Sequence, residues 1–146
     1  MTPAPRLAGT VLGFDFGTRR IGVAVGNTIT RSASPLTTIE IADDRARIDA
    51  IAALVGEWTP AQLVVGIPVH ADGAEHAMTT RAREFARMLE RRFRVPVARV
   101  DERYSTQIAQ QVLDASPLPR ARHRPLRDHV AAQVILQGWF DDPRPA

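Results

Sequence analysis

Three acidic residues, Asp15, Glu102 and Asp128, are the first candidates for chemistry in this chain. Asp15 ends an apolar segment, Glu102 directly follows another, and Asp128 lies near the start of the last helical segment. An acid in apolar surroundings is costly unless something pairs with it, and carboxylates that converge repel one another. A divalent cation removes both penalties. Oxygen ligands without His or Cys favour Mg²⁺ or Mn²⁺, and one or two such ions can drive hydrolysis of phosphodiester bonds.

The element that must position Asp15 is the segment from Thr10 to Asn27. Two runs rich in β-branched or aromatic residues flank a short turn, Gly17-Thr18-Arg19-Arg20. This pattern predicts two antiparallel strands joined by a hairpin.

The rest of the chain alternates between strand and helix patterns. The pattern predicts a loop over 28–34, strands over 35–40, 62–67 and 95–101, helices over 43–58, 75–93 and from Ser105 or Thr106, a loop over 116–125 and a last helix over about 126–140. A hairpin followed by strand-helix-strand units predicts a mixed sheet with helices on both faces.

The predicted sheet brings the three acids together. Ligands of such sheets gather at the carboxyl ends of the parallel strands, so Asp15 and Glu102 can share one edge. Asp128 shares a helix face with the core-like residues Ala131, Ala132 and Ile135, which predicts that it faces the sheet.

Each acid also has an ordinary structural interpretation. Asp15 could cap the hairpin turn, Glu102 could pair with the adjacent Arg103 at a helix start, and Asp128 could be a favourable charge near a helix N-terminus. Asp72 competes with Glu102, because it follows the strand over 62–67. Asp101 lies on the opposite face of its strand from Glu102 and is the weaker candidate.

The basic residues suggest a phosphate polymer as partner. All nineteen basic residues are Arg and none is Lys, with a net charge of +3. Guanidinium groups match phosphate oxygens, so we predict nucleic-acid contacts from Arg19, Arg20, Arg122 and Arg124. The alternative for the cluster over 116–127 is a solvated surface loop.

Composition limits the other classes of protein. A chain of 146 residues predicts one domain, 1–146, with flexible tails over 1–8 and 141–146. The absence of cysteine excludes disulfides and thiolate metal sites. No signal-peptide or membrane-spanning pattern is found, so we expect a cytoplasmic protein with no membrane partner.

Four segments together resemble the YqgF family, also called RuvX, of Holliday-junction-resolvase-like bacterial proteins. They are GFDFGTRRIGVAVGN, LVVGIPVHADGAE, VDERYSTQIA and RDHVAAQVILQGW, and they span nearly the whole chain. Two positions depart from the family pattern: Arg19 stands where Lys is common, and Tyr104-Ser105-Thr106 where Leu-Thr-Thr is common.

The resemblance implies an RNase H-like α/β fold, with a five-stranded mixed sheet in the order 3-2-1-4-5 and strand 2 antiparallel. It also implies a Mg²⁺- or Mn²⁺-dependent nuclease with catalytic acids at Asp15, Glu102 and Asp128. Its implied role is processing of the 5′ end of precursor 16S ribosomal RNA.

Three other functions are considered. A resolvase of branched DNA would use the same chemistry but needs a symmetric homodimer, whereas an RNA nuclease can be a monomer. A non-catalytic nucleic-acid-binding module would keep the fold without turnover. An actin-like ATP site also uses an Asp-x-Gly-Thr hairpin, but it needs two domains around the nucleotide.

Overall fold

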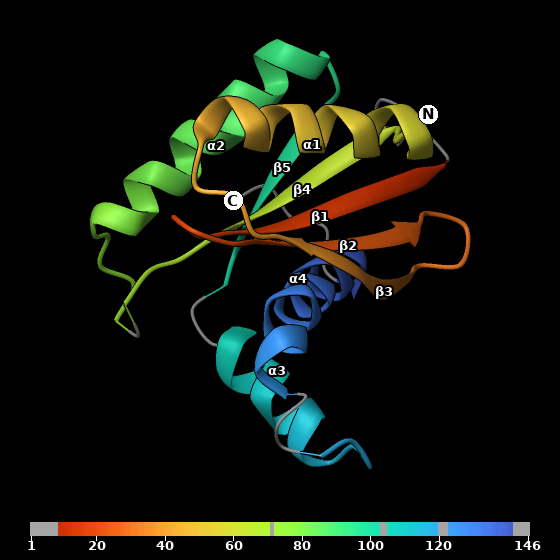
Figure 1. Cartoon of the computed structure of the whole chain (residues 1–146), viewed down its shortest axis with the longest axis vertical. Coiled ribbons are helices and arrows are strands. Elements are labelled where there is room, and N and C mark those ends of the chain that lie inside the picture. Colours follow the sequence, from red (N-terminus) through yellow and green to blue (C-terminus); the bar gives the residue numbers. More distant parts are fainter. Residues whose placement is uncertain (1–8, 71, 103–104, 120–122, 142–146) are drawn as a thin grey trace.

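The computed structural model describes residues 9–70, 72–102, 105–119 and 123–141, with the side chains of 105–107 and 123–125 left out. A five-stranded sheet lies between two layers of helices (Figure 1). The strands are β1 (Thr10–Phe16), β2 (Ile21–Asn27), β3 (Ser32–Ile39), β4 (Gln62–Ile67) and β5 (Val97–Asp101). The helices are α1 (Asp44–Trp58), α2 (Ala77–Phe93), α3 (Ser105–Asp114) and α4 (His123–Asp141).

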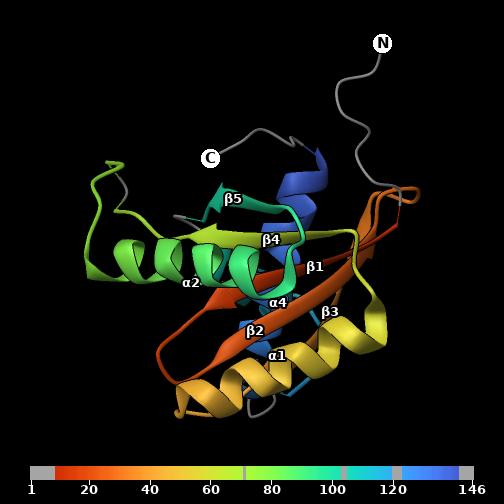
Figure 2. The ribbon, with the colours of Figure 1, turned by 90° about the horizontal axis from the view of Figure 1, so that it is seen from above.

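The strand order is β3-β2-β1-β4-β5, as predicted. β2 pairs antiparallel with both β1 and β3, whereas β1, β4 and β5 run parallel to one another. The carboxyl ends of β1, β4 and β5 therefore meet at one edge of the sheet. Figure 2 shows this edge beside the loop that leads from β4 to α2.

One face of the sheet carries α1 and α2. Large side chains from the strands, among them Leu12, Phe14 and Ile21, pack there against Ile51 of α1 and Leu89 of α2. All five of these side chains are at most 1% exposed. This face is the main hydrophobic core of the described residues.

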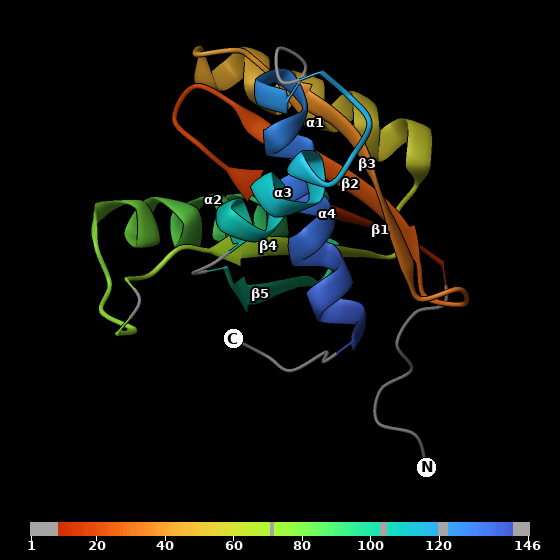
Figure 3. The ribbon, with the colours of Figure 1, turned by 90° about the horizontal axis from the view of Figure 1, so that it is seen from below.

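The other face carries α4, and α3 lies on the outer side of α4 (Figure 3). α4 crosses β1, β2 and β3, with Ala132, Leu136 and Trp139 against the sheet. Its other side buries Val130 and Ala131 against α3.

Glutamines fix where α4 sits along β3. The Gln137 side chain accepts a hydrogen bond from the Ala33 N–H at 3.0 Å, and the Gln133 side chain donates to the Ala33 carbonyl at 3.0 Å. Gln137 also donates to the Arg31 carbonyl. These contacts satisfy backbone groups that β3, the last strand on its side of the sheet, would otherwise leave unpaired.

Several predicted boundaries were wrong by a few residues. β3 begins at Ser32, inside the predicted loop over 28–34, because residues 32–34 pair with β2. α4 begins at His123, so the end of the predicted loop over 116–125 is helical. α2 begins at Ala77 instead of residue 75, because the His76 side chain caps it and forms a capping box with Thr79.

Asp43 caps α1, because its side chain accepts a hydrogen bond from the Ala46 N–H. α4 includes Asp141, and the predicted flexible segments 1–8 and 142–146 lie outside the described residues. Within the described part of the chain, none of the helices has the length and hydropathy needed to cross a membrane.

Candidate active site

Asp15 lies near the carboxyl end of β1, on the face of the sheet that α4 covers. Its strand neighbours Phe14 and Phe16 point to the opposite face, where both contact the Phe85 ring. Because strand residues alternate between faces, this packing directs Asp15 toward α4. In the antiparallel register Asp15 stands opposite Gly22 of β2.

Glu102 directly follows β5 and reaches Asp15. The Glu102 N–H donates to the Ile67 carbonyl at 3.1 Å, which continues the β4–β5 pairing by one step. The Glu102 side chain forms a hydrogen bond with Asp15. Such a bond between two carboxyl groups requires that one of them carry a proton.

The electrostatics of Asp15 show that its environment opposes ionisation. Burial raises the pKa of Asp15 from 3.8 to about 6, the hydrogen bond with Glu102 lowers it, and the Asp128 charge raises it. An acid at the end of a strand that merely capped a turn would keep an ordinary or lowered pKa. Burial is therefore the main cause of the raised pKa of Asp15, and the Asp128 charge adds to it.

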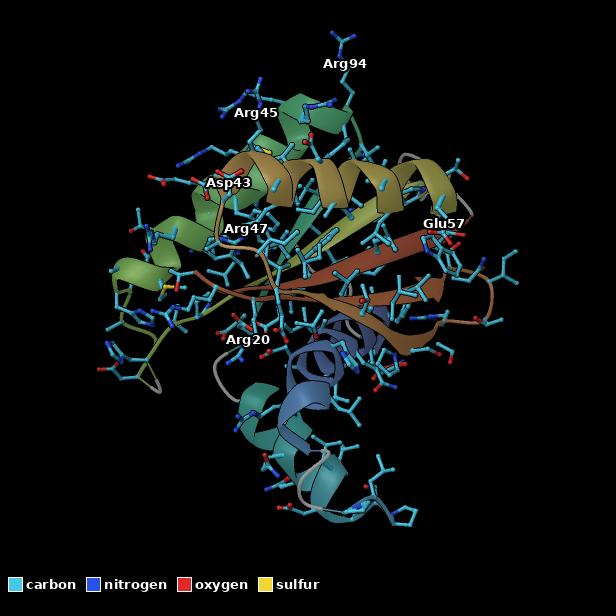
Figure 4. The ribbon with its side chains drawn as sticks, in the orientation of Figure 1. Arg20, Asp43, Arg45, Arg47, Glu57 and Arg94 are labelled. Carbon is cyan, nitrogen blue, oxygen red and sulfur yellow. The ribbon has the colours of Figure 1, made fainter. Side chains whose placement is uncertain are left out.

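Asp128 is the third member of this cluster and has its own counter-ion. Its carboxylate lies 3.1 Å from the Nε of Arg20, in an ion pair whose side chains are 27% and 41% exposed. Figure 4 shows Arg20 on the α4 side of the sheet, below β1 and β2. Arg20 was predicted to contact nucleic acid. In the structure it forms an ion pair with Asp128, which was predicted to bind a metal.

Two glycines allow the acids to approach each other. A Cβ at Gly22 would overlap the backbone carbonyl of Asp128, so only glycine lets α4 come this close to β2. A Cβ at Gly66 would lie 2.9 Å from a carboxylate oxygen of Glu102 and 2.5 Å from Ile135. Glycine inside a strand commonly marks such a close approach.

His129 fixes the start of α4 on β3. Its Nδ1 lies 2.9 Å from the Thr38 hydroxyl, and burial lowers the pKa of His129 while the neighbouring Asp128 charge opposes that shift. A largely neutral imidazole at this position adds no cation to the acid cluster at neutral pH.

Of the other predicted residues that the structure describes, Asp72 does not belong to the cluster. The Asp72 carboxylate accepts a hydrogen bond from the Ala74 N–H at 2.8 Å and serves the turn after β4. Asp101 is exposed, and Arg19 is exposed in the β1–β2 turn. Arg103 and Arg122 lie outside the described residues, and Arg124 belongs to α4 but its side chain is not described.

Sequence reasoning missed Arg47 of α1, which is only 6% exposed. Its guanidinium donates to the Thr18 carbonyl at 2.9 Å and to the Gly17 carbonyl, both in the turn that follows Asp15. A signal was present, because Arg47 lies one helical turn before the buried Ile51 and so on the apolar stripe of its helix.

The cluster has the chemistry of a site for an oxygen-preferring divalent cation. The Glu102 side chain is hydrogen-bonded to Asp15, and Asp128 is compensated by the ion pair with Arg20. Carboxylate oxygens alone are the ligand set that Mg²⁺ and Mn²⁺ prefer. Among the residues that the structure describes, no three acidic or histidine side chains already converge as a metal cage.

Solved structures define the class of this fold. The Thermus thermophilus RuvC in complex with a Holliday junction aligns with a TM-score of 0.55 at 17% identity, over 94% of this chain and 99% of that one. The fowlpox virus resolvase with Holliday junction DNA aligns with a TM-score of 0.57 at 6% identity, over 92% and 98%. The chain therefore has the RNase H-like fold of RuvC-like resolvases.

The sequence then gives the family. The family model described as "RuvX: Holliday junction resolvase" matches residues 9–142, and the chain belongs to this family. A Nitrosomonas europaea protein is 54% identical over 134 residues, which are 92% of this chain and 90% of that protein. A Chromobacterium violaceum protein is 51% identical over 133 residues, covering 90% and 97%. Both carry the name "Putative pre-16S rRNA nuclease".

Proposed function

We propose that this protein is a metal-dependent nuclease that hydrolyses phosphodiester bonds of structured RNA, in maturation of the 5′ end of precursor 16S ribosomal RNA. The observation that carries the proposal is the acid cluster of Asp15, Glu102 and Asp128 at the carboxyl edge of the sheet. The RuvX membership and the names of the relatives at about half identity support both the reaction class and the RNA substrate.

In this proposal the three acids hold Mg²⁺ or Mn²⁺, as one or two ions. A divalent cation there would supply an activated water and neutralise charge on the leaving oxygen. Binding of a cation there would require deprotonated carboxylates, and Asp128 would have to leave its ion pair with Arg20. Arg20 would then be available to a phosphate of the substrate, next to the exposed Arg19.

The raised pKa of Asp15 gives the proposed site a pH dependence. Below about pH 6 the Asp15 carboxyl group is protonated, and the proton competes with the cation for the carboxylate oxygens. We therefore expect metal-dependent cleavage to rise with pH through this region and to need less metal at pH 8 than at pH 6.

The test is cleavage of a precursor 16S RNA fragment that carries the 5′ extension, with Mn²⁺, Mg²⁺ or EDTA. Asp15→Asn, Glu102→Gln and Asp128→Asn should each lower cleavage by at least about a thousandfold, since a carboxylate ligand is lost. Asp72→Asn is the matched control, because Asp72 serves only a turn, and it should cleave like the wild type. Undiminished cleavage by Asp15→Asn would refute the catalytic assignment.

A DNA junction resolvase is the second candidate, favoured by the description of the matched family. It shares the acids but needs two sites presented by a homodimer. A four-way DNA junction assayed beside the RNA fragment separates the two functions. Turnover of neither, by a protein that still binds RNA, would favour the non-catalytic binding module. Because the proposed substrate is ribosomal RNA, we also place the protein in the cytoplasm.

A further inference from the structure

Arg47 is a buried cation that the hydrophobic core does not need. It lies between α1 and the sheet, among Phe16, Ile48 and Ile51. Figure 4 shows it reaching from α1 toward the sheet, whereas Arg45 on the same helix points away. A guanidinium taken out of water costs free energy unless its N–H groups are satisfied, so the groups that Arg47 contacts indicate why an arginine stands here.

The contacts of Arg47 converge on one short segment. The guanidinium donates to the Gly17 and Thr18 carbonyls and lies 5.2 Å from the centre of the Phe16 ring. These three consecutive residues directly follow Asp15. Although Arg47 is only 6% exposed, one side of it borders a cavity of about 490 Å³, so packing contacts do not surround it completely. Its orientation is therefore set by the hydrogen bonds and the ring.

The two hydrogen bonds fix the direction of two peptide planes. In a planar trans peptide the carbonyl and the following N–H point in opposite directions. Since the Gly17 and Thr18 carbonyls point at Arg47, the N–H groups of Thr18 and Arg19 point away from it. Two successive N–H groups with one orientation form a concave site for an anion, and the fixed positive charge behind them favours the same ligand.

We propose that Arg47 is a positioning residue: by holding the Gly17 and Thr18 carbonyls, it aims the N–H groups of Thr18 and Arg19 at a phosphate of the nucleic-acid substrate. The inference rests on the proposed function, because it takes the anion to be a backbone phosphate. Arg47 itself does not touch the substrate. It fixes the turn that joins Asp15 to Arg19 and Arg20, so the acids and the phosphate contacts keep one geometry.

The test compares Arg47→Met with Arg45→Met. Both variants remove one positive charge from α1, but Arg45 is exposed and its side chain points away from the sheet. Affinity for the precursor RNA fragment is measured in EDTA, so that cleavage does not enter. Arg47→Met should bind about tenfold more weakly, and Arg45→Met should stay within about twofold of the wild type. Arg47→Met leaves the Gly17 and Thr18 carbonyls without their donor and should lower the urea midpoint, so affinity is compared at a temperature where both variants are fully folded.

A second measurement uses the wild type and needs no variant to fold. In an NMR titration with the same RNA in EDTA, the amide signals of Thr18 and Arg19 should be among the most shifted. Equal affinity of Arg47→Met and Arg45→Met, or unmoved Thr18 and Arg19 amides in the RNA-bound wild type, would overturn the inference and leave the proposed nuclease standing. A wild type that neither binds nor cleaves the RNA would instead remove the proposed function.

Discussion

Phe14 and Asp15 are neighbours in β1, yet they serve opposite faces of the sheet. Phe14 is fully buried among large side chains from α1, α2 and the strands. Asp15 faces α4, where the sheet offers glycines at 13, 22, 26 and 66, at each of which a Cβ would come within 3.0 Å of a neighbouring atom. Large apolar side chains fill the α1/α2 face. On the α4 face, glycines without side chains let the helix and the three acids approach the sheet.

The difference teaches where stability and chemistry reside. Burial of large apolar groups on the α1/α2 face stabilises the folded chain. The α4 face keeps an acid, Asp15, whose pKa burial raises, together with its hydrogen bond to Glu102 and the ion pair of Asp128 with Arg20. A cation that binds only the folded protein at the proposed site would add to its stability. Four substitutions and one matched control can break or sharpen this comparison.

The largest loss of stability should come from Phe14→Ala, on the α1/α2 face. A fully buried phenylalanine truncated to alanine costs about 3–5 kcal/mol through lost burial and the cavity left behind. Because the neighbouring Asp15 faces the other way, the fraction that remains folded at low temperature should cleave like the wild type. Urea unfolding and cleavage at about 10 °C, corrected for the folded fraction, check both parts. A catalytic loss far greater than the unfolded fraction would mean that the two faces are not separable.

On the α4 face, Gly22→Ala should combine a smaller loss of stability with loss of function. Its Cβ would overlap the Asp128 carbonyl, so α4 must move away from β2. Overpacking of this kind costs about 1–3 kcal/mol, and the shift of Asp128 should cut cleavage by at least about a hundredfold.

Gly138→Ala in α4 is the matched control, since its Cβ would have nothing within 4 Å. It should leave cleavage unchanged and stabilise the protein by about 0.5–1 kcal/mol, because glycine is a poor helix former. Equal cleavage by the two variants would show that the glycine contact does not position the acid.

Much of the fold could be predicted because its signals are local. The nearly all-apolar segment 62–67 indicated a central parallel strand, and the stripe from Met78 to Phe93 indicated a helix. The start of β3 could not be predicted, because residues 32–34 are strand only through their pairing with β2 and the Gln133 and Gln137 side chains. The start of α2 was misjudged because histidine is an uncommon helix cap.

The candidate site was predicted unevenly for a similar reason. Asp15, Glu102 and Asp128 stood out as acids beside apolar segments. In the structure Glu102 bonds to Asp15 and the Asp128 charge acts on it, but the described side chains do not converge as a metal cage, so their catalytic role stays a prediction. The partner of Asp128 could not be foreseen, since Arg20 was assigned to nucleic acid. The role of Arg47 depends on which carbonyls a turn presents to a helix, and no spacing in the sequence encodes that.

Asp15→Asn should raise the stability of the metal-free protein at neutral and alkaline pH. The pKa of Asp15 is about 6 in the folded protein against an ordinary 3.8, so the folded state binds more protons between these values. Ionisation of Asp15 therefore lowers the free energy of unfolding, by at most about 3 kcal/mol. This penalty disappears as pH falls through 6 toward 4. In EDTA, the urea midpoint of Asp15→Asn should exceed that of the wild type at pH 8, and the two midpoints should become equal near pH 4.

Added metal should reverse this order. A cation that binds only the folded wild type stabilises it in proportion to the logarithm of its concentration, so 10 mM Mg²⁺ should raise the urea midpoint of the wild type and leave Asp15→Asn unmoved. If the difference in stability between the two metal-free proteins stayed constant from pH 4 to pH 8, the pKa of Asp15 would not be raised in the folded protein.

The smallest effect is expected for Glu90→Gln, which removes a charge pair from the α1/α2 face. Glu90 of α2 accepts two hydrogen bonds from Arg99 of β5, at 2.7 and 3.0 Å, and these lower the pKa of Glu90. Because the Glu90 side chain is 41% exposed, water and salt screen the pair, and its loss should cost less than about 1 kcal/mol at pH 7.

The lowered pKa of Glu90 means that the pair contributes to stability above the ordinary pKa of glutamate and that this contribution is lost as pH falls. The direction is opposite to that for Asp15. Urea midpoints at pH 7 and pH 4, in low and high salt, test it; a loss above about 2 kcal/mol would place a strong electrostatic contribution on the face assigned to apolar packing.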